Sequence, residues 1–76
     1  MKQEQIQVMN NLNIQYLADD YAWWIKHHGD GRSKLGFRFG QFIFNKYSFE
    51  FDQSYFVESA TSAYKLLLRG LKAKNK

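Results

Sequence analysis

Residues 37–56 read FRFGQFIFNKYSFEFDQSYF and contain all seven phenylalanines of the chain. The spacing of these rings indicates whether the middle of the protein is a helix or a hairpin, because the two structures repeat apolar side chains at different periods. A helix over residues 32–47 collects an apolar face: Leu35, Phe39, Phe42, Ile43 and Tyr47. Polar side chains then lie on the opposite face, which is typical of a helix packed on a core.

The same segment also fits two strands, since apolar and other residues alternate over 35–39 and again over 47–51. The Asn-Lys turn between these runs lacks the glycine that tight hairpins prefer. A helix has its own cost, because Gly36 and Gly40 inside it are each less favourable than alanine by about 1 kcal/mol. However, these two glycines are four residues apart and have no side chains, so they leave room for a neighbouring helix. We expect the helix, with a hairpin within 35–52 (an α+β fold) as the alternative.

The amino-terminal part of the chain, from about residue 3 to 28, is expected to form one long helix that ends at Gly29. Helical spacing divides its apolar residues into two stripes rather than one. The first, expected to face the core, comprises Ile6, Ile14, Leu17, Tyr21, Trp24 and Ile25. The second comprises Val8, Met9, Leu12, Tyr16 and Trp23.

The second stripe suggests an interface, because a chain of 76 residues offers few neighbours to cover it. Exposed apolar surfaces of this kind usually mark contacts with another protein. We therefore predict a homodimer, or a complex with another protein, with these residues at the contact: Val8, Met9, Leu12, Tyr16 and Trp23. The alternative is a domain that wraps both stripes by itself.

After the second helix, residues 48–58 are expected to form an extended or one-turn connector whose aromatic rings pack on the core. Ser59 then caps a last helix over about 60–71, weakened near its end by Gly70. The chain is thus predicted to be a single all-α domain over residues 1–76.

Composition restricts the compartment and the sources of stability. The chain has no cysteine, so neither disulfides nor a cysteine-rich zinc site can stabilise it, and 18% aromatic residues supply buried area instead. It contains no apolar stretch long enough to span a membrane. We expect a cytoplasmic protein.

A net charge of +4, with no acid after Glu58, raises a second function: a small basic accessory protein that binds nucleic acid. Basic and aromatic residues interleave over residues 32–39, as in proteins that track a backbone while rings stack on bases. The residues expected to contact nucleic acid are Arg32, Lys34, Arg38, Lys65, Arg69 and Lys72. The alternative is that the rings form the core and the basic end of the last helix is solvated.

Catalysis and metal binding find little support. Adjacent residues on a helix point about 100° apart, so His27 and His28 do not converge on one ion. Residues 29–34, GDGRSK, resemble a phosphate loop but follow a helix rather than a strand, and we interpret them as a turn with Asp30 or Ser33 capping the next helix. We predict no enzyme, cofactor, metal or small-molecule substrate.

The residues Arg38, Gly40, Gln41, Asn45 and Tyr47, followed by YFVE at 55–58, resemble a pattern in small uncharacterised proteins of phages, plasmids and other mobile elements. Those proteins have an R-x-G-Q-x-x-x-N-x-(F/Y) helix and a later L-F-x-E element. The resemblance implies a helix over 33–47 and an accessory role in mobile DNA. It brings no catalytic residues, and the tryptophan-bearing helix lies outside it.

Overall fold

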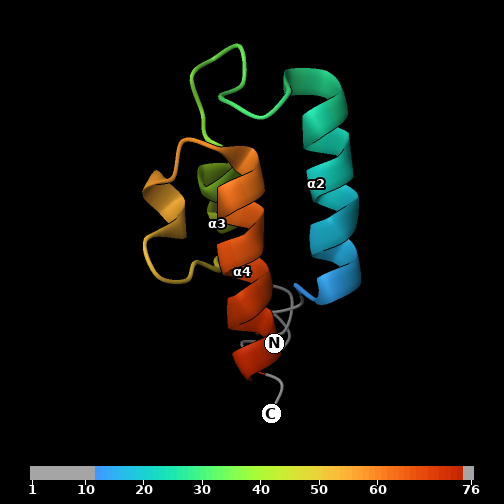
Figure 1. The fold of residues 1–76 in the computed structure, drawn as a ribbon, viewed down its shortest axis with the longest axis vertical. Coiled ribbons are helices and arrows are strands. Elements are labelled where there is room, and N and C mark those ends of the chain that lie inside the picture. Colours follow the sequence, from blue (N-terminus) through green and yellow to red (C-terminus); the bar gives the residue numbers. More distant parts are fainter. Residues whose placement is uncertain (1–11, 75–76) are drawn as a thin grey trace, which may run out of the picture.

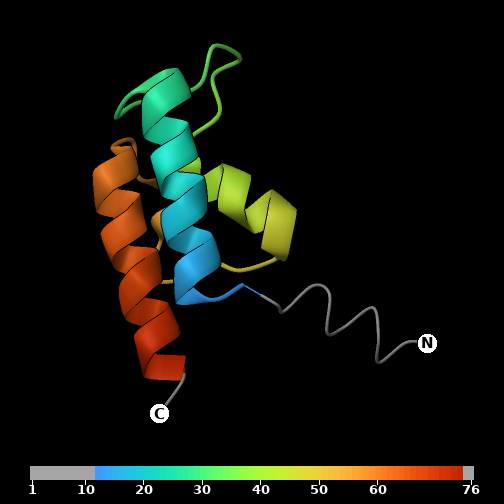
Figure 2. The same cartoon turned by 90° about the vertical axis from the view of Figure 1, so that its right-hand side faces the viewer.

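The computed structural model describes residues 12–74 and is all-α, as predicted. Its elements are α2 (Ile14–His28), α3 (Phe39–Tyr47), the 3₁₀ turn η1 (Ser54–Phe56) and α4 (Ala60–Lys74). Helices α2 and α4 lie side by side and antiparallel, and α3 crosses them (Figures 1 and 2). The alternative hairpin is wrong, because the described chain contains no strand between residues 35 and 52.

Helix α2 begins at Ile14 and not near residue 3. Asn13 is extended, with φ −135° and ψ 177°, and its side-chain oxygen accepts a hydrogen bond of 2.8 Å from the backbone N–H of Tyr16. This is the geometry of a helix N-cap, for which asparagine is among the best residues. The predicted helix over 3–28 is therefore not continuous, because residues 12 and 13 are not helical, and its expected start near residue 3 lies outside the described residues. Its predicted end is confirmed, because Gly29 at φ 72° donates to the Ile25 carbonyl.

Helix α3 is shorter than predicted and begins at Phe39. The N–H of Gly36 donates to the Ser33 carbonyl at 2.9 Å, and Gly36 has φ 91°, which a right-handed helix does not allow. The backbone N–H of Arg38 then donates to the Gln41 side-chain oxygen at 3.0 Å. Residues 29–38 consequently form a loop, and Leu35, predicted on the apolar helix face, is 85% exposed.

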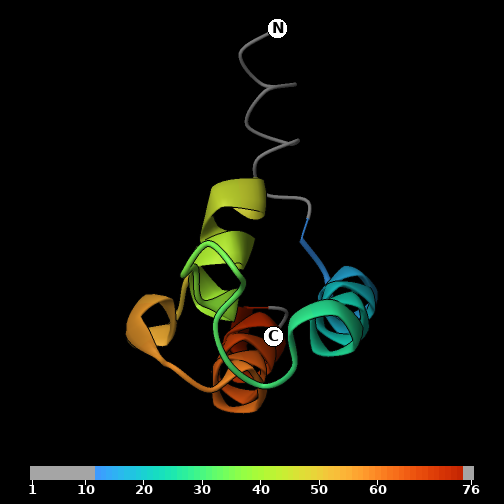
Figure 3. The same ribbon diagram turned by 90° about the horizontal axis from the view of Figure 1, so that it is seen from above.

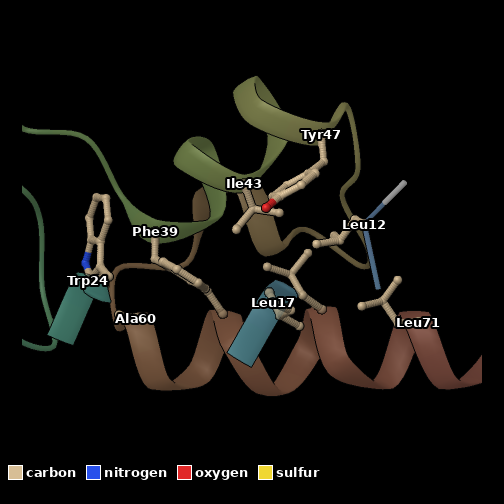
Figure 4. Close-up of a cluster of buried hydrophobic side chains, with 10 residues drawn as sticks. Leu12, Leu17, Trp24, Phe39, Ile43, Tyr47, Ala60 and Leu71 are labelled. Carbon is tan, nitrogen blue, oxygen red and sulfur yellow. The ribbon is translucent and has the colours of Figure 1, made fainter. Parts of the chain in front are cut away.

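The core lies where α2, α3 and α4 meet (Figure 4). Four members of the first predicted stripe of α2 face the core, since Leu17 and Trp24 are buried and Tyr21 and Ile25 pack against them. The prediction is wrong for Ile14, which is 39% exposed in the first turn of the helix, and Ile6 lies outside the described residues. The buried apolar residues are Leu12, Leu17, Trp24, Phe39, Ile43, Tyr47, Ala60, Ala63, Leu67 and Leu71.

The connector approaches two helices closely at their glycines. A β-carbon at Gly40 would collide with the backbone carbonyl oxygen of Ser54, so η1, and not another helix, uses the room that Gly40 leaves. A β-carbon at Gly70 would lie 2.6 Å from Cγ of Phe51. Gly70 therefore has a packing role beyond the weak helix end that we expected.

Helix α4 begins as predicted and continues to Lys74, beyond the expected end at residue 71. Its start is capped twice. The hydroxyl oxygen of Ser59 accepts from the backbone N–H of Ser62 at 3.2 Å, and the carboxylate of Asp30 accepts from the backbone N–H of Thr61 at 2.7 Å. Asp30, one of two residues expected to cap the helix after residue 32, thus caps the last helix instead. None of the helices among residues 12–74 is long and apolar enough to cross a membrane.

Candidate functional site

An apolar hollow of about 360 Å³ opens between α2, α3 and the loop 29–38. The loop spans from the end of α2 to the start of α3 when the molecule is seen from above (Figure 3). We call this cavity the aromatic hollow. Its lining residues are Trp23, Trp24, His28, Ser33, Lys34, Leu35, Phe37, Phe42 and Asn45.

The floor of the hollow is held in place by Trp24. This residue is 2% exposed, and its indole N–H donates to the Gly31 carbonyl at 3.0 Å, which joins the loop to α2. Its ring lies 4.6 Å from that of His28 and 5.3 Å from that of Phe42, measured between centroids. Such tilted and edge-on aromatic contacts are favourable, so the floor is a rigid surface.

The rim, in contrast, is open to solvent. Trp23 is 47% exposed, Phe37 is 49% exposed and Leu35 protrudes from the loop. The loop holds this shape because Ser33 and Phe37 bond to each other: the Ser33 N–H donates to the Phe37 carbonyl at 2.8 Å, and the Phe37 N–H donates to the Ser33 hydroxyl at 3.2 Å. A fixed loop thus presents large apolar side chains next to an apolar cavity.

The predicted interface residues do not all lie on this surface. Tyr16 and Trp23 are 46% and 47% exposed on one face of α2, as expected. Leu12 was expected beside them but is buried in the core, because it precedes the N-cap and is not on the helix. Val8 and Met9 lie outside the described residues.

Leu35 and Phe37 belong to the exposed surface but were missed, because the predicted helix placed Leu35 on its buried face. The available signal was the pair of glycines at 31 and 36, which bracket a short segment and are typical of a loop.

Three charged residues form a surface cluster beside the loop, which we call the arginine clasp. Glu58 accepts two hydrogen bonds from Arg32, Nε to Oε1 at 2.8 Å and Nη2 to Oε2 at 2.7 Å. Arg38 Nε donates to the same Oε2 at 2.9 Å. Hydrogen bonds from Arg32 and then from Arg38 lower the pKa of Glu58 from 4.5 to about 2, and Glu58 in turn raises the pKa of Arg32.

The residues predicted to contact nucleic acid divide into two groups. Arg32 and Arg38 belong to the clasp, and the exposed Lys34 lies on the same loop at the edge of the hollow. The second group, on α4, is spaced to lie opposite the buried face of that helix, and it consists of the exposed side chains Lys65, Arg69 and Lys72. No α4 residue is among those that line the hollow in the described chain. Of the six residues, only Lys34 lines the hollow.

The remaining polar clusters are structural. Asp20 on α2 accepts from the Tyr47 hydroxyl at 2.6 Å and from Lys46 Nζ at 3.0 Å, which joins α2 to α3. Burial, and then the hydrogen bond to Asp20, raise the pKa of Tyr47. His27 stacks on Trp23 at 4.5 Å between centroids. Over the described residues, no three histidine or acidic side chains converge as a metal site would require.

No protein-family model, curated protein or solved structure matches the chain.

Proposed function

We propose that this chain is a small non-enzymatic interaction module that self-associates through the aromatic hollow and the adjoining face of α2. The observation that supports this most directly is the half-exposed Trp23 at the edge of an apolar cavity of about 360 Å³. Aromatic side chains that fill pockets of the partner are typical of the central residues of protein interfaces.

A second copy of the chain is the occupant that the surface fits. Leu35 is 85% exposed and protrudes beside the hollow, so the same surface has both a projection and a cavity. In a two-fold dimer each copy uses the same surface, and a projection next to a cavity is therefore self-complementary. Each Leu35 would enter the hollow of the partner, against Trp23 and Phe42.

Size also favours association. A domain of this length is near the lower limit for an unaided core, and over residues 12–74 its buried apolar cluster consists of ten residues. A dimer adds apolar contacts that the single chain lacks. Following the resemblance of residues 38–58 to proteins of mobile elements, we place the module among the accessory proteins of mobile DNA, and the lack of cysteine suits the reducing cytoplasm.

Trp23→Ala tests the self-association. We expect the variant to shift from dimer toward monomer, with an association constant about thirtyfold weaker, because truncation of an aromatic residue that is central to an interface costs about 2 kcal/mol. Mass is measured by light scattering after size exclusion, and helicity by circular dichroism. Helicity should change less than mass, since Trp23 is half outside the core.

Phe56→Ala is the matched control. Phe56 is a more exposed aromatic residue (67%) on η1, and it is not among the residues that line the hollow. Its replacement should leave the mass unchanged. Leu35→Ser, on the loop and outside the core, should reduce the mass as Trp23→Ala does. A monomeric wild-type chain, or a dimer that both hollow variants retain, would exclude the proposal.

A further inference from the structure

The arginine clasp is an arrangement of two guanidinium groups around one acceptor. Arg32 donates two hydrogen bonds to the Glu58 carboxylate. Arg38 donates a third to Oε2, the oxygen that Arg32 Nη2 already contacts. Both arginines come from one loop, whereas Glu58 comes from the segment just before α4. Planar guanidinium groups bind carboxylates and phosphates with the same paired geometry. The position of the Glu58 carboxylate is therefore a position that a phosphate can occupy.

Glu58 can leave this position more easily than Arg38 can. Its side chain is 60% exposed, while those of Arg32 and Arg38 are 49% and 21% exposed, so the contrast is clear only for Arg38. An exposed carboxylate that turns outward is solvated again, so its displacement by a stronger anion requires no rearrangement of the core. The loop that presents the arginines is fixed by the bonds between Ser33 and Phe37.

The other acid of this region does not compete for the arginines. Asp30 accepts from the backbone N–H of Thr61, from the Thr61 hydroxyl at 2.6 Å and from the Ser59 hydroxyl at 2.9 Å. Its carboxylate is thus occupied at the start of α4. Without Glu58, the loop would present Arg32, Lys34 and Arg38 with no acid bonded to them.

We propose that Arg32 and Arg38 form a phosphate-binding site for a nucleic-acid backbone, and that Glu58 is an internal competitor which occupies the site in the free protein. A polyanion, rather than a single phosphorylated side chain, is the ligand that the chain's charge favours. The net charge is +4, and after Glu58 the sequence contains only basic charges. A single strand suits the site best, because Phe37, next to Arg38, is 49% exposed in the single chain and can stack on a base, a contact that competes with self-association through the hollow.

Glu58→Gln tests this site by removing the competing charge while keeping the shape of the side chain. The probe is a fluorescently labelled oligo-deoxythymidine, and its binding is followed by anisotropy at about 50 mM salt. We expect the Kd to fall by about threefold to tenfold relative to the wild type. The slope of log Kd against log salt should steepen by about 0.7 for each additional phosphate contact.

Glu50→Gln is the matched control, because it changes the net charge equally. Glu50 is exposed on the connector and forms no ion pair with any described residue. It should alter the Kd far less than Glu58→Gln does. Combining Glu58→Gln with Arg32→Gln should abolish the gain in affinity. Combining it with Arg32→Lys, which keeps the charge but loses the paired geometry, should remove most of that gain. Circular dichroism verifies that each variant is folded.

Three results would overturn the proposal: equal gains from Glu58→Gln and Glu50→Gln, a gain that survives Arg32→Gln, or no binding by any variant. Competition with unlabelled ligands identifies which kind of anion the site binds. Unlabelled single-stranded DNA should displace the probe better than duplex DNA, a phosphoserine peptide or inorganic phosphate at equal phosphate concentration. A phosphoserine peptide that competes best would reject the assignment to nucleic acid. Repeating the titration in Trp23→Ala separates this site from self-association.

Discussion

At the scale of single residues, Gly40 determines how closely the connector packs on α3. It is buried, and a side chain there would meet the backbone carbonyl of Ser54, a residue that is itself fully buried. A backbone group cannot move aside as the end of a flexible side chain can. The glycine is therefore required for contact between α3 and η1, although glycine weakens the helix that contains it.

Gly40→Ala should destabilise the protein by roughly 2 kcal/mol, measured by urea unfolding, because overpacking outweighs the gain of about 1 kcal/mol in helix propensity. Gly31→Ala is the control, since a β-carbon at Gly31 would have open space and its φ is not in the left-handed region. The control should stay within about 1 kcal/mol of the wild type. Equal stability of Gly40→Ala and the wild type would show that the connector is not packed as described.

At the scale of elements, the helix ends are determined by side chains that satisfy free backbone groups. Asn13 caps α2 from the position just before it, so this cap is formed by neighbours in the sequence. The start of α4 is different, because Asp30 reaches it from the loop after α2, 31 residues away in sequence from Thr61. A carboxylate at this end also interacts favourably with the helix dipole. The cap thus joins the loop after α2 to the start of α4.

Asp30→Ala should lower the melting temperature by about 5 °C, because it removes the acceptor of three hydrogen bonds at the start of α4. The melting temperature is followed by circular dichroism. Asp19→Ala is the control: Asp19 is an exposed carboxylate on α2 that accepts one bond, from Gln15. A shift of similar size in the control would mean that Asp30 has no special role as a cap.

At the scale of the whole molecule, polar contacts connect the loop 29–38 to the start of α4. Asp30 caps the helix with its side chain, its backbone carbonyl accepts from the Ala60 N–H at 2.9 Å, and the arginine clasp bonds the loop to Glu58. They keep the loop over the end of the helix pair, where it forms one side of the aromatic hollow. The hollow is consequently a product of tertiary contacts and not of any single element.

The clasp should make the stability of the fold depend on pH in the acid range. Hydrogen bonds from Arg32 and Arg38 lower the pKa of Glu58 from 4.5 to about 2 in the folded state. Its contribution to stability is therefore complete above about pH 4.5 and is lost as the pH falls toward 2, because the unfolded chain takes up the proton first. The lowered pKa of Asp30 acts in the same direction.

Thermal melts between pH 7 and pH 2 measure this dependence. Glu58→Gln should lose less stability than the wild type over the acid range, and Glu50→Gln should retain the wild-type slope. Parallel curves for the wild type and Glu58→Gln would show that the clasp does not contribute to folding.

The sequence alone favoured the helical class over a hairpin, placed most of the first stripe of α2 against the core, and predicted the end of that helix at Gly29 and the start of α4 after Ser59. These follow from periodicity and from caps formed by neighbours in the chain. It also indicated that Trp23 would be left outside the core. The starts of α2 and α3 depend on local caps, at Asn13 and between Arg38 and Gln41, which the sequence analysis did not identify. Only the tertiary structure decided that Leu12 packs in the core and that Leu35 protrudes from a loop. A strong apolar period over 35–47 fits a helix equally well whether or not its first turn is formed. The contacts that position the loop 29–38 join groups whose proximity no local pattern specifies. These contacts are Trp24 to Gly31, Asp30 to Thr61 and Glu58 to two arginines.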